Sequence, residues 1–177
     1  MTRRSRDPAL SAPRVTVVGV LGQRGVVAID DIPTGEVALV VKGVRTARPS
    51  RYSIQVGERE HIDLPEGIDP ARSAVEYPWQ FLNHSCAPNA RLVGRSFVAA
   101  RPIEAGDEIT FDYNTTEYDM ASPFDCRCGA SACRGRRIAG FRHLGSAERL
   151  ALLPCLTDAL HARLAQESGT ARAVSRE

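Results

Sequence analysis

The sequence predicts a mostly β fold of small antiparallel sheets, followed by a helical C-terminal segment. Short apolar stretches separated by turn residues fill the first two thirds of the chain, and leucines recur every three or four residues near its end. Between these parts lies a stretch rich in cysteine and turn formers, which predicts that something other than an apolar core holds the chain there. The length of 177 residues suits one domain with a small appendage.

Several predicted strands come in pairs around a glycine. Residues 52–56 and 61–64 flank Gly57, and residues 90–93 and 97–101 flank Gly94, so each pair predicts a hairpin. A helical turn is expected before Pro78, because proline disfavours helix in the residue that precedes it. The other predicted elements are strands at 14–20, 25–29, 36–42 and 109–113, and the helical turn itself covers 73–77.

The C-terminal leucines predict an amphipathic helix. Pro154 should kink or split this helix, and Ser146 is the expected N-cap. Packing on the sheet is the favoured role of its apolar face, with a dimer contact as the alternative. We expect a flexible tail after Gln166. The leucines are Leu150, Leu153, Leu156, Leu160 and Leu164.

Composition and charge exclude several classes of function. The net charge of +2 is too small to indicate a nucleic-acid site, and the arginines at 45, 48 and 51 and at 134, 136 and 137 are expected to be solvated surface. No apolar run has the length of a membrane span, and the N-terminus lacks the apolar stretch of a secretory signal. We therefore expect an intracellular protein, cytoplasmic if bacterial and nuclear if eukaryotic.

Three cysteines lie close together in the sequence and suggest a metal site. Cys126, Cys128 and Cys133 form a C-x-C-x4-C pattern, and a closed zinc site needs four ligands. Cys86, in a polar segment, is the best candidate for the fourth ligand, with His84 as the alternative. Free thiols or a disulfide are the competing interpretations, and a Cys126–Cys128 disulfide would be strained. Cys155 is expected to be a buried apolar residue.

The most informative stretch is Phe-Leu-Asn-His-Ser-Cys-Ala-Pro-Asn at residues 81–89. By itself it indicates a buried strand end that enters a hydrogen-bonded loop. Together with Asp-Glu-Ile-Thr-Phe-Asp-Tyr at 107–113 and the cysteines that follow, it resembles the signature motifs of the SET domain protein-lysine methyltransferases and their post-SET segment. The turn Pro-Thr-Gly-Glu at 33–36 is similar to an early turn of the family, and the resemblance covers about residues 15–140.

The resemblance implies a fold and a domain organisation. It implies small, mostly antiparallel sheets in which the Asn-His-Ser segment threads under a loop as a pseudoknot, closed by a zinc-bound post-SET loop. The implied segments are a flexible tail at 1–13, the SET domain at 14–118, the post-SET segment at 119–140, a C-terminal helix at 141–167 and a flexible tail at 168–177.

The resemblance also implies an activity, the transfer of a methyl group from S-adenosylmethionine to a lysine amine of a histone or other basic protein. Tyr113 matches the tyrosine beside the transferred methyl, Tyr52 a second tyrosine near the lysine channel and the cofactor, and Phe111 the position that sets how many methyls are added. Cys86 matches the cysteine that completes the structural zinc site. The remaining residues that match cofactor-binding positions are Gln23, Arg24, Gly25, Asn83, His84 and Ile138.

Some positions depart from the family pattern. Gln23-Arg24-Gly25 replaces the usual Gly-x-Gly, Val41 a tyrosine, Gln80 an arginine, and Glu76-Tyr77 a Gly-Asn pair. Two other functions therefore stay open. One is a catalytically inactive SET-type module that binds cofactor or partner, and the other is a zinc-stabilised interaction module without cofactor.

Overall fold

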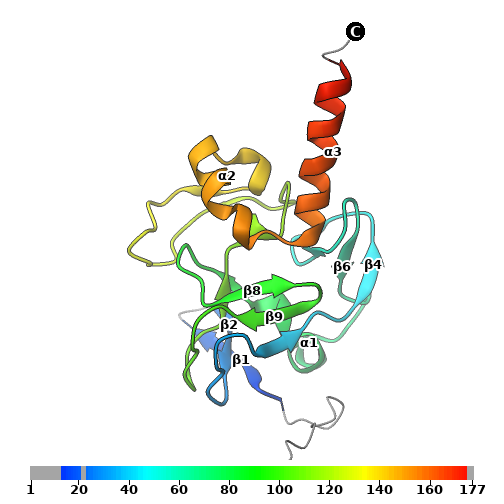
Figure 1. The fold of residues 1–177 in the computed structure, drawn as a ribbon. Helices are drawn as coiled ribbons and strands as arrows, with labels where there is room; N and C mark the ends of the chain where they lie inside the picture. The colour runs from blue at the N-terminus through cyan, green and yellow to red at the C-terminus, as the bar shows by residue number, and fades with distance from the viewer. Residues whose placement is uncertain (1–12, 21–22, 175–177) are drawn as a thin grey trace, which may run out of the picture.

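The computed structural model describes residues 13–20 and 23–174 and consists mainly of short strands. Residues 1–12 and 175–177, which hold most of the predicted N-terminal tail and the end of the C-terminal one, lie outside the described residues. Figure 1 shows small sheets packed into one body, with α3 projecting from it toward the C-terminus. No helix among residues 13–20 and 23–174 is long and apolar enough to cross a membrane.

In the part of the chain that the structure describes, the strands form five small sheets, four of them antiparallel throughout. The remaining sheet pairs two short strands in parallel. The sheets are β1 (Val15–Val20) with β2 (Gln23–Ala28), β3 (Val37–Val40) with β9 (Ser96–Ala99) and β8 (Ala90–Val93), β4 (Val44–Thr46) with β6 (His61–Asp63) and β5 (Ile54–Gln55), the parallel pair β7 (Asn83–His84) and β10 (Thr110–Phe111), and β11 (Phe124–Asp125) with β12 (Arg137–Ile138).

Helices are short except at the C-terminus. The α-helices are α1 (Pro70–Glu76), α2 (Ser146–Leu152) and α3 (Asp158–Val174), and the 3-10 turns are η1 (Pro78–Phe81), η2 (Tyr113–Thr115), η3 (Phe141–His143) and η4 (Leu153–Cys155).

Both predicted hairpins are confirmed. β5 pairs with β6 and β8 pairs with β9, each in antiparallel register across the predicted glycine turn. The sequence did not indicate β4, β11 or β12. These strands are only two or three residues long and depend on their partners rather than on an alternating pattern.

The predicted strand at 109–113 is wrong at its end. Pairing stops after Phe111, and a 3-10 turn begins at Tyr113. Asp112 is the reason, because its carboxylate accepts a hydrogen bond from the N–H of Asn114 at 3.0 Å and so caps the turn.

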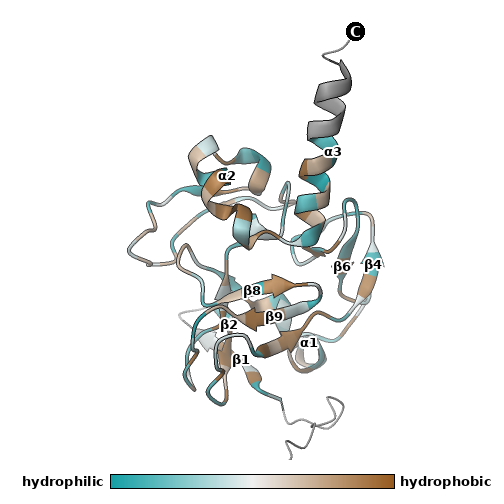
Figure 2. Ribbon diagram, in the orientation of Figure 1, coloured by the Kyte–Doolittle hydropathy of each residue, from teal (hydrophilic) through white to brown (hydrophobic). Residues whose placement is uncertain are grey.

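The main core lies between the sheets. Its fully buried side chains include Trp79, Phe97 and Ile62, with Val26 and Phe111 beside them. Figure 2 shows the hydrophobic residues along the central strands β8 and β9. Backbone bonds from Val26 and Ala28 to the 107–109 segment fasten the β1–β2 hairpin to this core.

The C-terminal helix is split at Pro154 as predicted, but its details differ. Gly145 is the N-cap, and Ser146 is the first helical residue. The helix α3 is described to Val174, and the flexible tail expected from residue 168 stays a prediction.

The buried leucines of this segment do not join the sheets. Leu156 and Leu160 pack with Phe141 and Leu144 in a second, smaller core, whereas Leu150 is 70% exposed. Cys155, expected to be buried, is exposed because the 3-10 turn at Pro154 changes the helical register. The dimer contact expected through this helix stays a prediction.

Candidate active site and metal centre

The two sequence motifs meet in the parallel pair β7 and β10. Asn83 lies opposite Thr110, and His84 lies opposite Phe111. Asn89, buried at the end of the first motif, stabilises the contact between the two motifs through its side-chain amide. Its Oδ1 accepts from the N–H of Thr110, and its Nδ2 donates to the carbonyl of Glu108, both at 2.8 Å.

A polar junction forms on one side of β7. Asn83 Nδ2 donates to the carbonyl of Arg24 at 3.1 Å and to Glu108 Oε1 at 2.7 Å. Gly25 lies against the same carboxylate, since a Cβ there would stand 2.6 Å from Glu108 Oε1. The structure thus brings together Arg24, Gly25 and Asn83, three of the predicted cofactor-binding residues. It adds Glu108, which the sequence analysis did not indicate. Gln23 begins β2 with an exposed side chain.

A pocket next to the start of β7 brings together all three predicted catalytic residues. Phe111 and Tyr113 line it with ring centroids 4.7 Å apart, and Tyr52, 49% exposed, stands at its mouth. Aromatic and apolar side chains form about half of the wall. The other lining residues are Ser50, Arg51, Ser53, Ile54, Trp79, Gln80, Leu82, Thr116, Glu117, Met120, Ala121 and Ser122.

The Tyr113 hydroxyl is held by the backbone of another lining residue, Leu82. It donates a 2.6 Å hydrogen bond to the carbonyl of Leu82, the residue before β7. Burial raises the pKa of Tyr113 well above its usual range, and the nearby Glu108 carboxylate raises it further. The hydroxyl therefore stays protonated at neutral pH and acts as a dipole and hydrogen-bond donor rather than as a base.

His84 lies between the pocket and the cysteines. Its Nδ1 accepts from the N–H of Tyr113 at 3.3 Å, and its Nε2 lies 3.4 Å from Cys86 Sγ. Burial lowers the pKa of His84 and outweighs the Asp112 carboxylate 3.5 Å away, so the ring is neutral. With Nδ1 accepting, Nε2 carries the proton and points it at the sulfur of Cys86.

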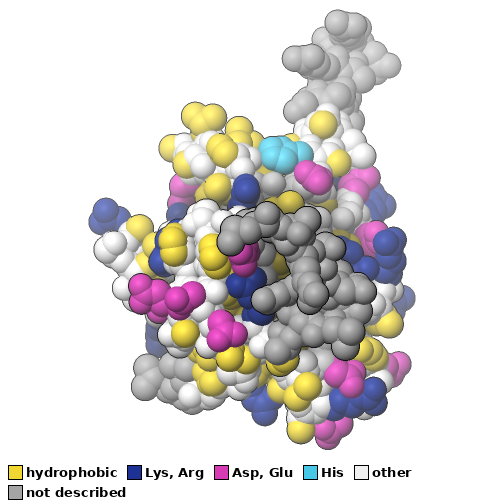
Figure 3. All heavy atoms as spheres, turned by 60° about the horizontal axis from the view of Figure 1, so that its bottom comes forward, with side chains coloured by type: hydrophobic (Ala, Val, Ile, Leu, Met, Phe, Trp, Pro, Cys, Tyr) yellow, Lys and Arg dark blue, Asp and Glu magenta, His cyan; other side chains and the backbone are white. Residues whose placement is uncertain are grey.

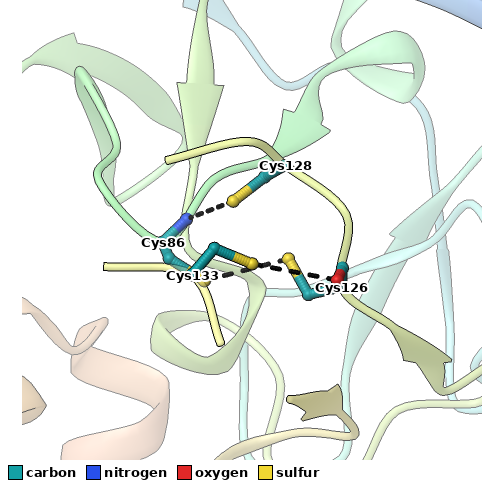
Figure 4. A group of neighbouring side chains, drawn as sticks. All are labelled: Cys86, Cys126, Cys128 and Cys133. Carbon is teal, nitrogen blue, oxygen red and sulfur yellow. Dashed lines mark hydrogen bonds between the residues drawn. The ribbon is translucent and has the colours of Figure 1, made fainter. Parts of the chain in front are cut away.

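The side chains of four cysteines converge (Figure 4), and one of them, Cys86, contacts His84. The sulfurs of Cys86, Cys126, Cys128 and Cys133 all lie within 4.8 Å of one another, and those of Cys86 and Cys126 are 3.8 Å apart. Tetrahedral zinc with Zn–S bonds of about 2.3 Å places its sulfurs about 3.8 Å apart. The donor set therefore fits a zinc ion, with His84 as a neighbour that contacts a ligand.

The protein environment distinguishes the four thiols. Burial alone would raise the pKa of Cys128, but the N–H groups of Cys86 and Ala130 and the neighbouring thiols lower it to about 6. Burial raises the pKa of Cys86 to about 11. Without a cation, one thiolate would form at neutral pH, and a bound metal would deprotonate the remaining thiols.

Phe124 is a residue that sequence reasoning missed. Its ring meets His84 and Tyr113 edge-on, with centroids 6.0 and 5.9 Å apart. The predicted residue Ile138 lies opposite Phe124 in the β11–β12 pair and is fully buried. The role of Ile138 toward an adenine ring stays a prediction.

A buried acid also forms part of the pocket wall. Glu117 Oε1 accepts from the N–H of Gln55 at 2.7 Å, and Glu117 Oε2 lies 3.7 Å from His61 Nε2. The side-chain Oε1 of Gln55 in turn accepts a hydrogen bond from the N–H of Tyr118 at 2.9 Å. These contacts join the β4–β6–β5 sheet to the chain after Tyr113.

The residues that depart from the family pattern are well accommodated. Val41 is fully buried in the main core. Gln80 lines the pocket and donates to Ser73 Oγ at 2.9 Å, which ties η1 to α1. Glu76 pairs with Arg72 on the surface of α1 at 2.6 Å.

Residues 23–114, just over half of the chain, match the SET domain description. The chain belongs to the SET domain family. The matched SET domain contains the pocket residues Phe111 and Tyr113 and the polar junction at Asn83, and it ends before the cysteine-rich stretch.

Several curated proteins are similar to this SET domain. Methyltransferase flvH of Aspergillus flavus is 38% identical over 114 residues, which cover 62% of this chain and 57% of that protein. Histone-lysine N-methyltransferase ash1 of Drosophila melanogaster is 34% identical over 104 residues, 54% of this chain and 4% of that protein. The H3 lysine-4 specific enzyme of Schizosaccharomyces pombe is 42% identical over 100 residues, 52% of this chain and 10% of that protein. The chain thus spans little more than half of the first relative and a tenth or less of the others.

A solved structure supports the fold. KRYPTONITE, crystallised with mCHH DNA, an H3(1-15) peptide and SAH, matches with a TM-score of 0.50 and 24% identity over 70% of this chain and 29% of that one. The likeness shows that the small sheets are arranged as in a SET domain.

Proposed function

We propose that this SET domain transfers a methyl group from S-adenosylmethionine to the side-chain amine of a lysine in a protein. One observation carries the proposal. Leu82 lines the aromatic pocket, and its carbonyl accepts the hydrogen bond from the Tyr113 hydroxyl. It directly precedes Asn83 of the polar junction, so the pocket and the junction adjoin at the start of β7. A donor held at the junction and an amine held in the pocket would meet there. The relatives named as histone-lysine methyltransferases support the same reaction.

The chemistry needs little beyond alignment. The amine attacks the methyl carbon, the carbon–sulfur bond breaks as the carbon–nitrogen bond forms, and a proton must leave the amine beforehand. Free lysine has a pKa of about 10.4, and an apolar, aromatic wall such as that of Phe111 and Trp79 disfavours its ammonium form. Tyr113 orients the acceptor and interacts with the methyl, which agrees with its raised pKa.

We further propose that residues 119–140 act as the post-SET segment and hold one structural zinc ion. Four thiolates leave no open coordination position, so the metal would fix the segment rather than take part in the reaction. Because thiolate sites depend on reduced cysteines, we propose an intracellular, reducing location.

Two experiments test the proposed function. Calorimetry with S-adenosylmethionine separates the methyltransferase and the inactive SET-type module, which both bind, from a zinc-stabilised module without cofactor. A labelled-methyl assay on mixed basic proteins, with the modified lysine identified by mass, then separates the active enzyme from the inactive module. Failure of the purified, zinc-loaded protein to bind the methyl donor would contradict the proposal.

A further inference from the structure

The mouth of the pocket carries a positive charge that no other described residue neutralises. Arg51 is exposed and lines the pocket beside Tyr52, with its guanidinium carbon 5.8 Å from the Tyr52 ring centroid. Among residues 13–20 and 23–174, no acidic side chain forms an ion pair with Arg51. Its neighbour Arg45, by contrast, pairs with Glu60 at 2.7 Å.

The acidic residue in the described pocket lining does not pair with Arg51. Glu117 is the acidic residue of the described lining, and it is buried and already bonded to Gln55 and close to His61. The lining residues Met120, Ala121 and Ser122 are uncharged. Arg51 is therefore a cation without a carboxylate partner in the described lining, although both signs of charge are interspersed on the face of the molecule seen in Figure 3.

The charge of Arg51 also reaches the pocket interior. Burial and Glu108 raise the pKa of Tyr113, and Arg51 acts on it in the opposite direction. A lysine ammonium that approaches this entrance is repelled by Arg51, and a second basic group beside it is repelled too. A carboxylate close to the amine would instead be attracted and would offset that repulsion.

We propose that Arg51 is a specificity-determining residue that selects a substrate with a carboxylate close to the methylated amine, in the first place a protein lysine flanked by Asp or Glu. This inference rests on the proposed function and narrows its substrate class. A rim pair of this kind is exposed, so its effect should be modest and sensitive to salt.

The test compares synthetic peptides that share one sequence around a single lysine and carry Glu, Gln or Arg at the two positions on either side. Methyl transfer is followed by mass spectrometry, and peptide binding is followed by fluorescence anisotropy with S-adenosylhomocysteine present. Free lysine and lysinamide, which differ only in the carboxylate, form a second arm. Arg51→Glu is compared with Arg91→Glu, which makes the same charge change at an exposed position of β8 outside the pocket lining.

We expect the native protein to prefer Glu over Gln by about two- to five-fold and to disfavour Arg, with the preference fading at high salt. Arg51→Glu should reverse the order, and Arg91→Glu should keep it. A preference for lysine over lysinamide without a peptide preference would assign the carboxylate to a small substrate. Equal binding and turnover of all acceptors overturns the inference while methyl transfer still proceeds, whereas loss of donor binding overturns the proposed function itself.

Discussion

The Tyr113 hydroxyl donates a 2.6 Å hydrogen bond to the carbonyl oxygen of Leu82, across 31 residues of sequence. This bond ties the end of the second motif to the start of the first and fixes the tyrosine in the pocket wall. It makes Tyr113 a positioned dipole with a raised pKa rather than a proton acceptor.

Tyr113→Phe should reduce methyl transfer on the order of 100-fold, because it removes a preorganised polar group beside the reacting atoms. Donor binding measured by calorimetry should change little. Tyr77→Phe, which alters another half-buried tyrosine packed on the core, is the matched control and should leave activity intact. Unchanged turnover in the Tyr113 variant would remove this residue from the reaction.

Cys128→Ser should lose bound zinc and methyl transfer together, because three ligands hold the metal weakly and the 119–140 segment then loosens. Metal content by mass spectrometry and the labelled-methyl assay are the two readouts. Cys155→Ser changes the exposed cysteine outside the cluster and should keep both. Full activity of a zinc-free protein would count against the structural role of the metal.

Gly25→Ala should weaken the binding of S-adenosylmethionine, with a smaller loss in the free energy of unfolding. The added Cβ would stand 2.6 Å from Glu108 Oε1, so the carboxylate must move and disturb its bond to Asn83. Gly19→Ala in the paired strand β1 has open space around its Cβ and serves as the control. In a Glu108→Ala background, Gly25→Ala should cause a smaller loss of S-adenosylmethionine binding. If the losses from the two substitutions simply add in the double variant, the coupling between Gly25 and Glu108 is excluded.

We expect the protein to add two or three methyls to the lysine amine. Phe111 has no hydroxyl that could hold a water beside the amine, so there is room for the methylated amine. Phe111→Tyr should shift the product toward monomethyl-lysine, as measured by the product masses over time. Product that is monomethyl-lysine in both the native protein and the variant would contradict this role for the side chain.

We expect Asp119 to make a small, pH-dependent contribution to the free energy of unfolding. Its hydrogen bond with His143 lowers its pKa, and Arg142 adds to the effect. Because the folded pKa lies below the unfolded value of 3.8, this contribution is present above about pH 4 and is lost as the pH falls through the folded pKa.

The pair is half exposed, so Asp119→Asn should cost less than about 1 kcal/mol at pH 7, and this difference from the native protein should shrink below pH 4. Urea unfolding at the two pH values measures it, with exposed Asp30→Asn as the control. A constant difference at both pH values would show that Asp119 does not act through its charge.

The sequence by itself determined the family motifs, the paired hairpins and the set of four cysteines, because these depend on local patterns and on ligand counting. It also indicated that Pro154 splits the C-terminal helix, since the missing N–H acts locally. Contacts between distant segments were decided only by the tertiary structure. Glu108, Phe124 and Arg51 gain their positions from the packing of segments that the sequence separates widely. Cys155 shows the same limit, because its exposure depends on how a 3-10 turn orients a side chain, and residue type alone carries no such information.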